Sequence, residues 1–374
     1  MRRSERHTGQ DARRRNRTLA LRIAYAAGAT SRAEIARITG LTRASASDIV
    51  RDLTEDGFLA EVGTGESTGG KPPTLLEFQA DARSVVTLDL STQPFRGAVL
   101  DLRGRFLTRR SLRTTGLTGA AAIERVTRLA AGLVKAAPAP VAGIGVGAPG
   151  LIDAEGTVIR STNVGWDGVP LARILGDATG RAAHVANDTS VAALAELAVR
   201  DEPSSNLMLV EISDGIGAGI VLDGAIHLGE SAAAGEIGHY AAVPGGQPCS
   251  CGRLGCLETV ASVPSVLRAA GVGSVDALSS GHAGSATAVD AAAEHLGRIL
   301  AAAVAVLDVH RIVLTGPLSR YDGDLAGMVR DAIAKQVLAQ VGDLVTVSWT
   351  KVGADIVLAG AAIHVMRSEL GIPW

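Results

Sequence analysis

Three cysteines and one histidine are the residues of this chain best suited to hold a metal ion. Cys249, Cys251 and Cys256 follow His239 within a short segment, and the 374 residues contain no other cysteine. Zinc in proteins prefers four thiolate or imidazole ligands in a tetrahedron, and a site closed by four protein ligands is structural. The spacing therefore predicts a structural zinc site. The alternative is a group of reduced, buried cysteines beside an unrelated histidine.

A second segment whose residue types and spacing indicate a binding function lies near the N-terminus, and it could bind DNA. Ser31, with Glu34 three residues later, forms a capping box and predicts a helix that ends near Gly40. Thr42 would cap another helix that ends at Gly57. Two short helices joined by a tight turn predict a helix-turn-helix, whose second helix enters the major groove of DNA.

The outward side chains of this second helix are the candidate DNA contacts. Arg43 is the candidate for a guanine edge, because a guanidinium group can bond two acceptors at once. Arg51, further along the helix, is a phosphate candidate. The complete set adds three hydroxyl residues and one lysine of the following hairpin: Thr42, Arg43, Ser45, Ser47, Arg51 and Lys71. The alternative is a helix-turn-helix that contacts protein, with its charges solvated.

A β-hairpin is expected directly after these helices. Residues 58–62 and 74–78 alternate as strands do, and the glycine-rich stretch 63–70 between them is typical of a hairpin tip. A hairpin after a helix-turn-helix is a wing, so residues 18–80 are predicted to form a winged DNA-binding domain. Residues 1–17 carry seven arginines and are expected to be a basic, flexible arm; the alternative is a solvated tail without a role.

The composition and the charge of the chain limit the classes of protein to which it can belong. With 47% hydrophobic and 20% charged residues, the chain is neither disordered nor a small disulfide scaffold, and it can form two or three domains. The net charge of −2 excludes a protein that coats polyanions, yet residues 1–80 have 13 basic and 10 acidic side chains, a net of +3. A basic front and an acidic remainder suggest a nucleic-acid module joined to another domain.

Residues 81–374 alternate strands and helices, which predicts an α/β fold. The expected strands are 85–90, 97–102, 141–146, 207–212, 218–222 and 311–314, and the expected helices are 120–137, 190–200 and 286–309. No uninterrupted apolar stretch approaches the roughly 18–20 residues of a membrane span, and no signal peptide is recognisable, so a cytoplasmic protein without membrane contact is expected.

Two motifs resemble a known family. Ala234-Gly235-Glu236-Ile237-Gly238-His239 and the segment from Cys249 to Glu258 look like the signature and zinc motif of the ROK family, which includes repressors and sugar kinases. Residues 31–34 and 69–73 are similar to the winged module of its transcriptional regulators. The resemblance implies an actin-like (ribonuclease H-like), two-lobed sugar-kinase fold over residues 81–374. The lobe boundary would fall near residue 190, and the C-terminal helix would return to the first lobe.

The resemblance also implies a sugar-binding cleft between the lobes. Its expected residues are Gly147, Asn163, Asn187, Asp188, Glu236, His239 and Glu258. In the family's kinases Asp188 would be the general base that takes a proton from the sugar hydroxyl. His239 could bind zinc through one ring nitrogen and approach the sugar with the other. The alternative for each carboxylate is a surface salt bridge.

The turns that hold ATP in the family's kinases differ here. The first reads Asp89-Leu90-Ser91-Thr92-Gln93-Pro94, without the usual glycines, and proline has no N–H to offer a phosphate. The second places Asp214 beside Gly215, and the adenosine-side turn has Pro317 after Gly316. We therefore expect a lost kinase activity, with Asp188 a vestigial base.

The predicted function is a sugar-responsive regulator of transcription, most plainly a repressor of carbohydrate uptake or catabolism genes. Its partners would be double-stranded operator DNA, a small sugar or sugar phosphate, and further copies of the chain in a homodimer or homotetramer. The alternative is a ROK-type ATP-dependent sugar kinase, weak or bifunctional.

Overall fold

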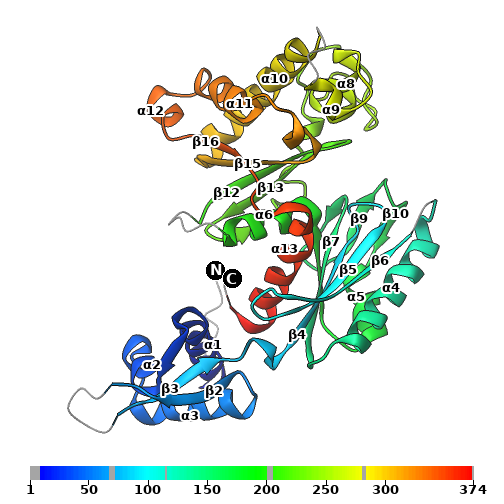
Figure 1. Cartoon of the computed structure of the whole chain (residues 1–374). Helices are drawn as coiled ribbons and strands as arrows, with labels where there is room; N and C mark the ends of the chain where they lie inside the picture. The colour runs from blue at the N-terminus through cyan, green and yellow to red at the C-terminus, as the bar shows by residue number, and fades with distance from the viewer. Residues whose placement is uncertain (1–8, 67–71, 114–115, 200–204, 280–283, 373–374) are drawn as a thin grey trace, which may run out of the picture.

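The computed structural model describes residues 9–66, 72–113, 116–199, 205–279 and 284–372, which form a winged module and two lobes (Figure 1). The winged module contains three helices and a three-stranded antiparallel sheet in the order β1-β3-β2. Its elements are α1 (Gly9–Ala27), β1 (Ala29–Ser31), α2 (Arg32–Thr39), α3 (Arg43–Glu55), β2 (Leu59–Thr64) and β3 (Thr74–Phe78).

Side-chain caps begin the two helices of the helix-turn-helix, as the sequence predicts. The Ser31 hydroxyl accepts a hydrogen bond from the Glu34 amide, and the Thr42 hydroxyl accepts one from the Ser45 amide. Gly40 ends α2 in the left-handed conformation. One strand was not expected: β1 adds a third strand to the wing by pairing with β3.

The expected flexible arm over residues 1–17 is wrong for residues 9–17, which form the first half of α1. Arginine is a good helix former, and two arginines of this segment reach α3: Arg13 lies 2.6 Å from Asp52, and Arg17 lies 2.6 Å from Asp56. The buried Ala20 and Leu21 then fix the second half of α1 to the module's core. Residues 1–8 lie outside the described residues.

Lobe 1 is built on a mixed five-stranded sheet in the order β11-β7-β4-β5-β6, with β4, β7 and β11 parallel. Helices α4 and α5 cover one face, and a small sheet, β8-β9-β10, follows β7 (Figure 1). The elements are β4 (Ser84–Asp89), β5 (Phe95–Asp101), β6 (Phe106–Leu112), α4 (Gly119–Ala136), β7 (Val141–Ala148), β8 (Leu151–Ile152), β9 (Val158–Ser161), β10 (Trp166–Val169), α5 (Leu171–Thr179) and β11 (Ala183–Asn187).

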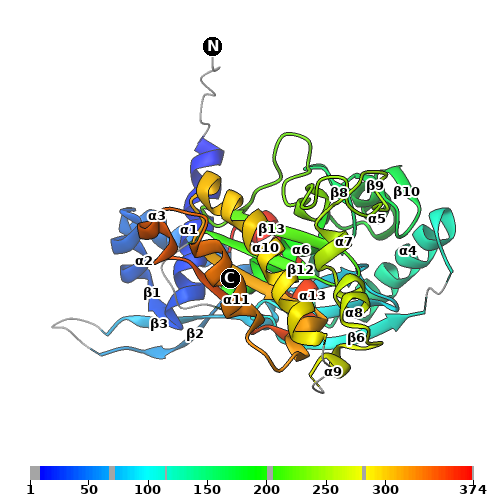
Figure 2. The same ribbon diagram turned by 90° about the horizontal axis from the view of Figure 1, so that it is seen from above.

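Lobe 2 contains a second five-stranded sheet, in the order β14-β13-β12-β15-β16. Helices α8, α10 and α11 pack on one face of that sheet and α6 packs on the other; α10 and α11 overlie the sheet in Figure 2. The elements are α6 (Asp188–Ala198), which lies between the lobes, β12 (Leu207–Ile212), β13 (Ile216–Leu222), β14 (Ala225–Ile226), α7 (Glu258–Ala261), α8 (Val263–Ala270), α9 (Val275–Leu278), α10 (Ser285–Leu307), β15 (Arg311–Thr315), α11 (Leu325–Ala334), α12 (Ala339–Gly342) and β16 (Thr346–Trp349).

The last helix, α13 (Ile356–Val365), returns to lobe 1, as expected, and joins all three parts of the molecule. Its first turn packs with α6 and lobe 2 strands in one apolar cluster. Its last residue, Val365, and the following Met366 belong to a second cluster, which also contains Leu21 and other core residues of the winged module. Figure 1 shows α13 running from α6 toward the winged module. The winged module is therefore packed onto lobe 1 through a common core.

Within the described segments, none of the helices is both long enough and apolar enough to traverse a bilayer.

Candidate functional site

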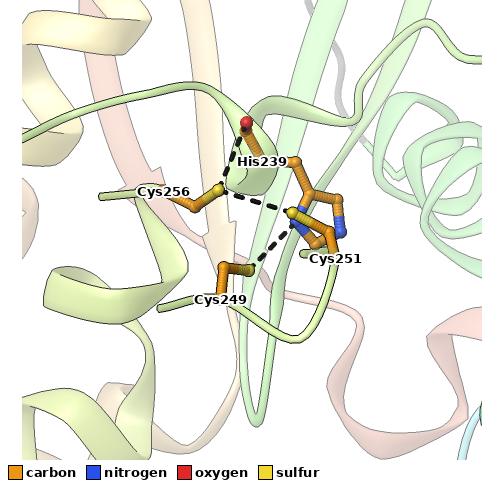
Figure 3. A group of neighbouring side chains, drawn as sticks. All are labelled: His239, Cys249, Cys251 and Cys256. Atoms are coloured by element: carbon orange, nitrogen blue, oxygen red, sulfur yellow. Dashed lines mark hydrogen bonds between the residues drawn. The ribbon is translucent and has the colours of Figure 1, made fainter. Parts of the chain in front are cut away.

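The four predicted metal ligands come together beside lobe 2 (Figure 3). Cys249 Sγ lies 3.6 Å from His239 Nδ1, and Cys251 Sγ lies 3.6 Å from Cys256 Sγ. All four ligand atoms lie within 4.8 Å of one another. A tetrahedral zinc ion with bonds of about 2.3 Å to sulfur and 2.0–2.1 Å to nitrogen needs ligand separations of roughly 3.6–3.8 Å. The cluster therefore has the chemistry and the spacing to hold a metal ion.

The backbone around the cluster is folded by its own short-range bonds. Residue pairs Ala241–Cys256 and Pro248–Leu254 form antiparallel bridges. Gly255 has a φ of +71°, and a Cβ there would lie 1.7 Å from the Val243 carbonyl oxygen, so only glycine fits this turn. These bonds bring the Cys256 thiol next to the histidine segment, within 3.5 Å of the His239 carbonyl oxygen.

The thiols have different proton affinities. Burial, and next to it the neighbouring thiols of Cys251 and Cys249, raises the pKa of Cys256 to about 12. A backbone hydrogen bond from Arg253 lowers the pKa of Cys251, which is exposed. A metal must displace the Cys256 proton to bind that sulfur as thiolate, as metal ions do at buried thiol sites.

A cavity of about 1420 Å³ opens beside this cluster, between the two lobes. Lobe 1 lines it with the β8–β9 region, and lobe 2 lines it with the β12–β13 turn and with the metal loop, residues 239–258, which carries the four predicted ligands. The start of α6, between the lobes, completes the wall. It is larger than the roughly 300–1,000 Å³ of a typical small-ligand pocket. The cavity is therefore an open cleft with room for a small polar ligand.

The N-terminal end of α6 places Asn187 and Asp188 on the cavity wall. The Asn187 side chain caps the helix: its Oδ1 accepts from the Ser190 amide at 3.1 Å, and its Nδ2 donates to the Gly150 carbonyl at 3.1 Å. Asp188 is only 9% exposed. Burial raises the pKa of Asp188 well above its ordinary value, and the charge of Glu211 raises it further.

Glu236, His239 and Glu258 line the opposite wall. His239 Nε2 lies 3.9 Å from Glu236 Oε2, while His239 Nδ1 faces the cysteines and lies 3.7 Å from Glu258 Oε2. Nδ1 is thus the nitrogen placed for a metal, and Nε2 the one on the side of Glu236. The use of one nitrogen by zinc and of the other by a sugar stays a prediction, with which these positions are compatible. Burial raises the pKa of Glu236, opposed by His239.

Six of the seven predicted sugar residues line the cavity, and Gly147 does not. Gly147 lies in β7, where a Cβ would come within 2.3 Å of a Val357 methyl group and 3.0 Å of a Val191 methyl group. Its lack of a side chain serves the packing of the sheet against α13 and α6, so the expected ligand role is wrong. Asn163 is exposed at the cleft edge.

Among the cavity residues that the sequence analysis did not single out are two charged ones, Glu211 and Arg160. Glu211 is the penultimate residue of β12, a strand that is otherwise apolar, and a lone carboxylate in such a strand was the signal for it. Arg160 ends up on the wall because the small β8-β9-β10 sheet, which was not expected, carries it there.

The first of the degenerate phosphate turns contains an internal ion pair. Asp89 is fully buried, and its Oδ2 accepts from Arg96 Nε at 3.2 Å. Arg96 also bonds Asp355, at the start of α13, and Arg109 reaches the same carboxylate at 3.0 Å. The guanidinium group of Arg96 thus lies beside Asp89, the first residue of the turn that would hold phosphate in the family's kinases.

The candidate DNA-contacting residues on α3 are all exposed: Thr42, Arg43, Ser45, Ser47 and Arg51. The hydroxyls of Thr42 and Ser45 bond each other at 2.9 Å, and Arg51 pairs with Asp48 at 2.9 Å. Arg43 makes no hydrogen bond or ion pair with the described residues. The predicted contact Lys71 lies outside those residues.

Comparison with known proteins agrees with this geometry. The ROK family model matches residues 85–368. The xylose repressor of Caldicellulosiruptor bescii is 29% identical over 67% of this chain and 65% of that protein, so the chain matches less than two thirds of that relative's length. The glucokinase of Halalkalibacterium halodurans is 32% identical over 61% of this chain and 77% of that protein.

A solved ROK transcriptional regulator, a homologue of the Escherichia coli Mlc protein, shares the fold of nearly the whole chain. It superposes with a TM-score of 0.85 at 23% identity, over 96% of this chain and 98% of that one. Both the signature motifs and the matched region therefore assign this chain to the ROK family.

Proposed function

We propose that this chain is a sugar-responsive transcriptional repressor that binds double-stranded operator DNA. The observation that carries the proposal is structural: α13 belongs to an apolar cluster shared with the winged module and to a second one shared with α6 and lobe 2, so it connects an exposed recognition helix to a cleft with room for a sugar. The similarity to a xylose repressor supports it. The protein would act in the cytoplasm, where its operator is, as a homodimer or homotetramer that contacts half-sites about one helical turn apart.

The metal would be zinc, bound by His239, Cys249, Cys251 and Cys256. A structural ion at this place would fix the orientation of the His239 ring and the path of the loop that leads to Glu258. The sugar would be held by Asn163, Asn187, Asp188, Glu236, His239 and Glu258, whose oxygen and nitrogen atoms surround the cleft from both lobes.

The direct test is a DNA-binding titration on the gene's own upstream region. Fluorescence anisotropy with a panel of sugars should reveal one that changes operator affinity by about 5–150-fold, the range of typical allosteric coupling. A protein that binds no upstream DNA, or whose affinity no sugar alters, would not be the proposed repressor.

Arg43→Ala should weaken operator binding by about 5–150-fold while leaving random-sequence DNA almost unaffected, because a bidentate guanine contact contributes about 1–3 kcal/mol of discrimination. Arg51→Ala is the matched control. Its expected phosphate contact carries no sequence information, so operator and random DNA should both weaken by a similar factor. An unchanged specificity ratio for Arg43→Ala would exclude its base-reading role.

A sugar kinase is the second candidate, and Asp188 is the observation that favours it, because this possible general base lies on the cavity wall. We propose that the activity has been lost, since Arg96 and Asp89 occupy the first phosphate turn. Purified protein with Mg-ATP and a hexose panel is therefore expected to form no phosphosugar. Sustained turnover that Asp188→Asn abolishes would establish the kinase instead.

A further inference from the structure

We infer that the cavity accepts a free, uncharged sugar and excludes the phosphate esters of that sugar. The inference rests on the proposed function, since it names the class of effector that the same cleft takes. A phosphate group needs backbone amides or cationic side chains to bind. The structure shows where these donors are used.

The first potential phosphate site is the N-terminus of α6, the usual place for an anion beside such a cleft. Here the chain's own oxygens occupy the free amides. The Thr189 amide donates to Asp188 Oδ1 at 2.8 Å, and the Ser190 amide donates to Asn187 Oδ1 at 3.1 Å. A carboxylate at the first helical position already interacts with the helix dipole, so a phosphate there would meet a like charge.

The second site is the turn between β12 and β13. The Ser213 amide donates to the Gly215 carbonyl at 2.9 Å, and the Ile216 amide donates to Glu258 Oε1 at 3.0 Å. Glu258 lies so close over this turn that a Cβ on Gly215 would be 2.7 Å from its Oε1. A carboxylate from the metal loop therefore takes the place that an anionic ligand would need.

The third site is the turn after β4. The Ser91 amide donates to Asp89 Oδ1 at 3.0 Å, and the Leu90 amide donates to the Gly147 carbonyl at 2.9 Å. The nearest guanidinium, that of Arg96, is bonded to Asp89 and Asp355. At each of the three turns, the two backbone amides named here are already bonded within the chain.

The charges of the cavity wall also disfavour the binding of a phosphate ester. Five carboxylates line it, against two arginines, Arg160 and Arg253, which are both exposed to solvent. The carboxylates are Asp188, Glu211, Asp214, Glu236 and Glu258. Burial raises the pKa of Glu211 as well as that of Asp188, and the neighbouring charges that act on the two groups are those of other carboxylates. A phosphate with a charge of about −1.5 to −2 would add to this repulsion, whereas neutral hydroxyls can donate to the carboxylates.

Isothermal titration calorimetry on the full-length, zinc-loaded protein tests this with matched pairs: xylose and xylose 5-phosphate, glucose and glucose 6-phosphate, N-acetylglucosamine and its 6-phosphate. At least one free sugar should bind, and its ester should bind at least about 30-fold more weakly. An ester that binds as tightly as its free sugar, or more tightly, overturns the inference and leaves the proposed repressor standing. If no saccharide of either kind binds, the proposed function and this inference fail together.

Glu211→Gln removes one wall charge with little change in shape, and it should narrow the ratio between free sugar and ester by about 3–10-fold. Glu155→Gln, an exposed carboxylate that does not line the cavity, is the control and should leave the ratio unchanged. An unaltered ratio in Glu211→Gln would show that the charge of the wall does not exclude the ester.

Discussion

Replacing Cys251 with serine is expected to remove stoichiometric zinc from the protein and to abolish its response to sugar. Cys251 Sγ lies 3.6 Å from Cys256 Sγ, and a serine hydroxyl cannot replace a thiolate in this set. Loss of groups that merely orient ligands costs 10–100-fold in metal affinity, so loss of a ligand should cost at least about 100-fold. Metal analysis of purified protein and a sugar titration measure the two effects together.

The two effects should be coupled because the metal loop reaches the cleft directly. His239 joins the cluster to the side of Glu236, and Glu258 lies two residues after Cys256 and bonds the β12–β13 turn. Gln247→Ala, an exposed change in the same loop, is the control and should keep both zinc and sugar binding. Full zinc content in Cys251→Ser would show that the ligand set is wrong. Zinc loss with unchanged sugar affinity would show that the metal does not shape the sugar site.

The features that could be predicted from sequence are those set by neighbours in the chain. The Ser31 and Thr42 caps depend on amides three residues away, and the apolar runs of β4, β7 and β12 identify buried strands by themselves. The metal ligands were predictable because thiols and imidazole have few other reasons to cluster. In that case the residues that carry the chemistry lie close together in the sequence, as the residues of the caps do.

The features that were missed depend on partners far away in the chain. The arginines of α1 were read as a mobile arm because their partners, Asp52 and Asp56, lie 39 residues later. Gly147 was assigned to the ligand because the methyl group nearest to its missing Cβ is that of Val357 in α13, over 200 residues away. The strand β6 was missed because most of its side chains are exposed and it is held by pairing with β5.

Arg367→Ala is expected to make the operator affinities with and without sugar converge, while sugar binding itself changes by less than about threefold. Arg367 lies two residues after the end of α13, in a short π-helix (Met366–Leu370), and donates from Nη1 to the Gly224 carbonyl, in the β13–β14 turn of lobe 2. This hydrogen bond ties the segment that follows α13, which packs on the winged module and lobe 1, to lobe 2. Neither Arg367 nor Gly224 lines the cavity.

The same segment also holds the winged module. Met366 and Ile372 are fully buried in the module's core cluster, and Arg22 of α1 donates from Nε to the Gly371 carbonyl. Movement of lobe 2 on sugar binding would therefore displace Arg367, which lies only a few residues before Gly371, the residue that Arg22 of α1 contacts. A ligand can shift the DNA-binding equilibrium only through such a difference between the two lobe arrangements.

Anisotropy titrations of operator DNA, with and without saturating sugar, measure this coupling, which is about 1–3 kcal/mol in typical allosteric proteins. Arg125→Ala, an exposed arginine on α4, is the control and should keep the full sugar response. Arg367→Lys retains the charge and a hydrogen-bond donor, so its sugar response should lie between those of the wild type and the alanine variant. This graded result would show that the alanine variant loses a contact and does not simply unfold. A full sugar response in Arg367→Ala would mean that the lobes signal to the winged module by a route other than the end of α13.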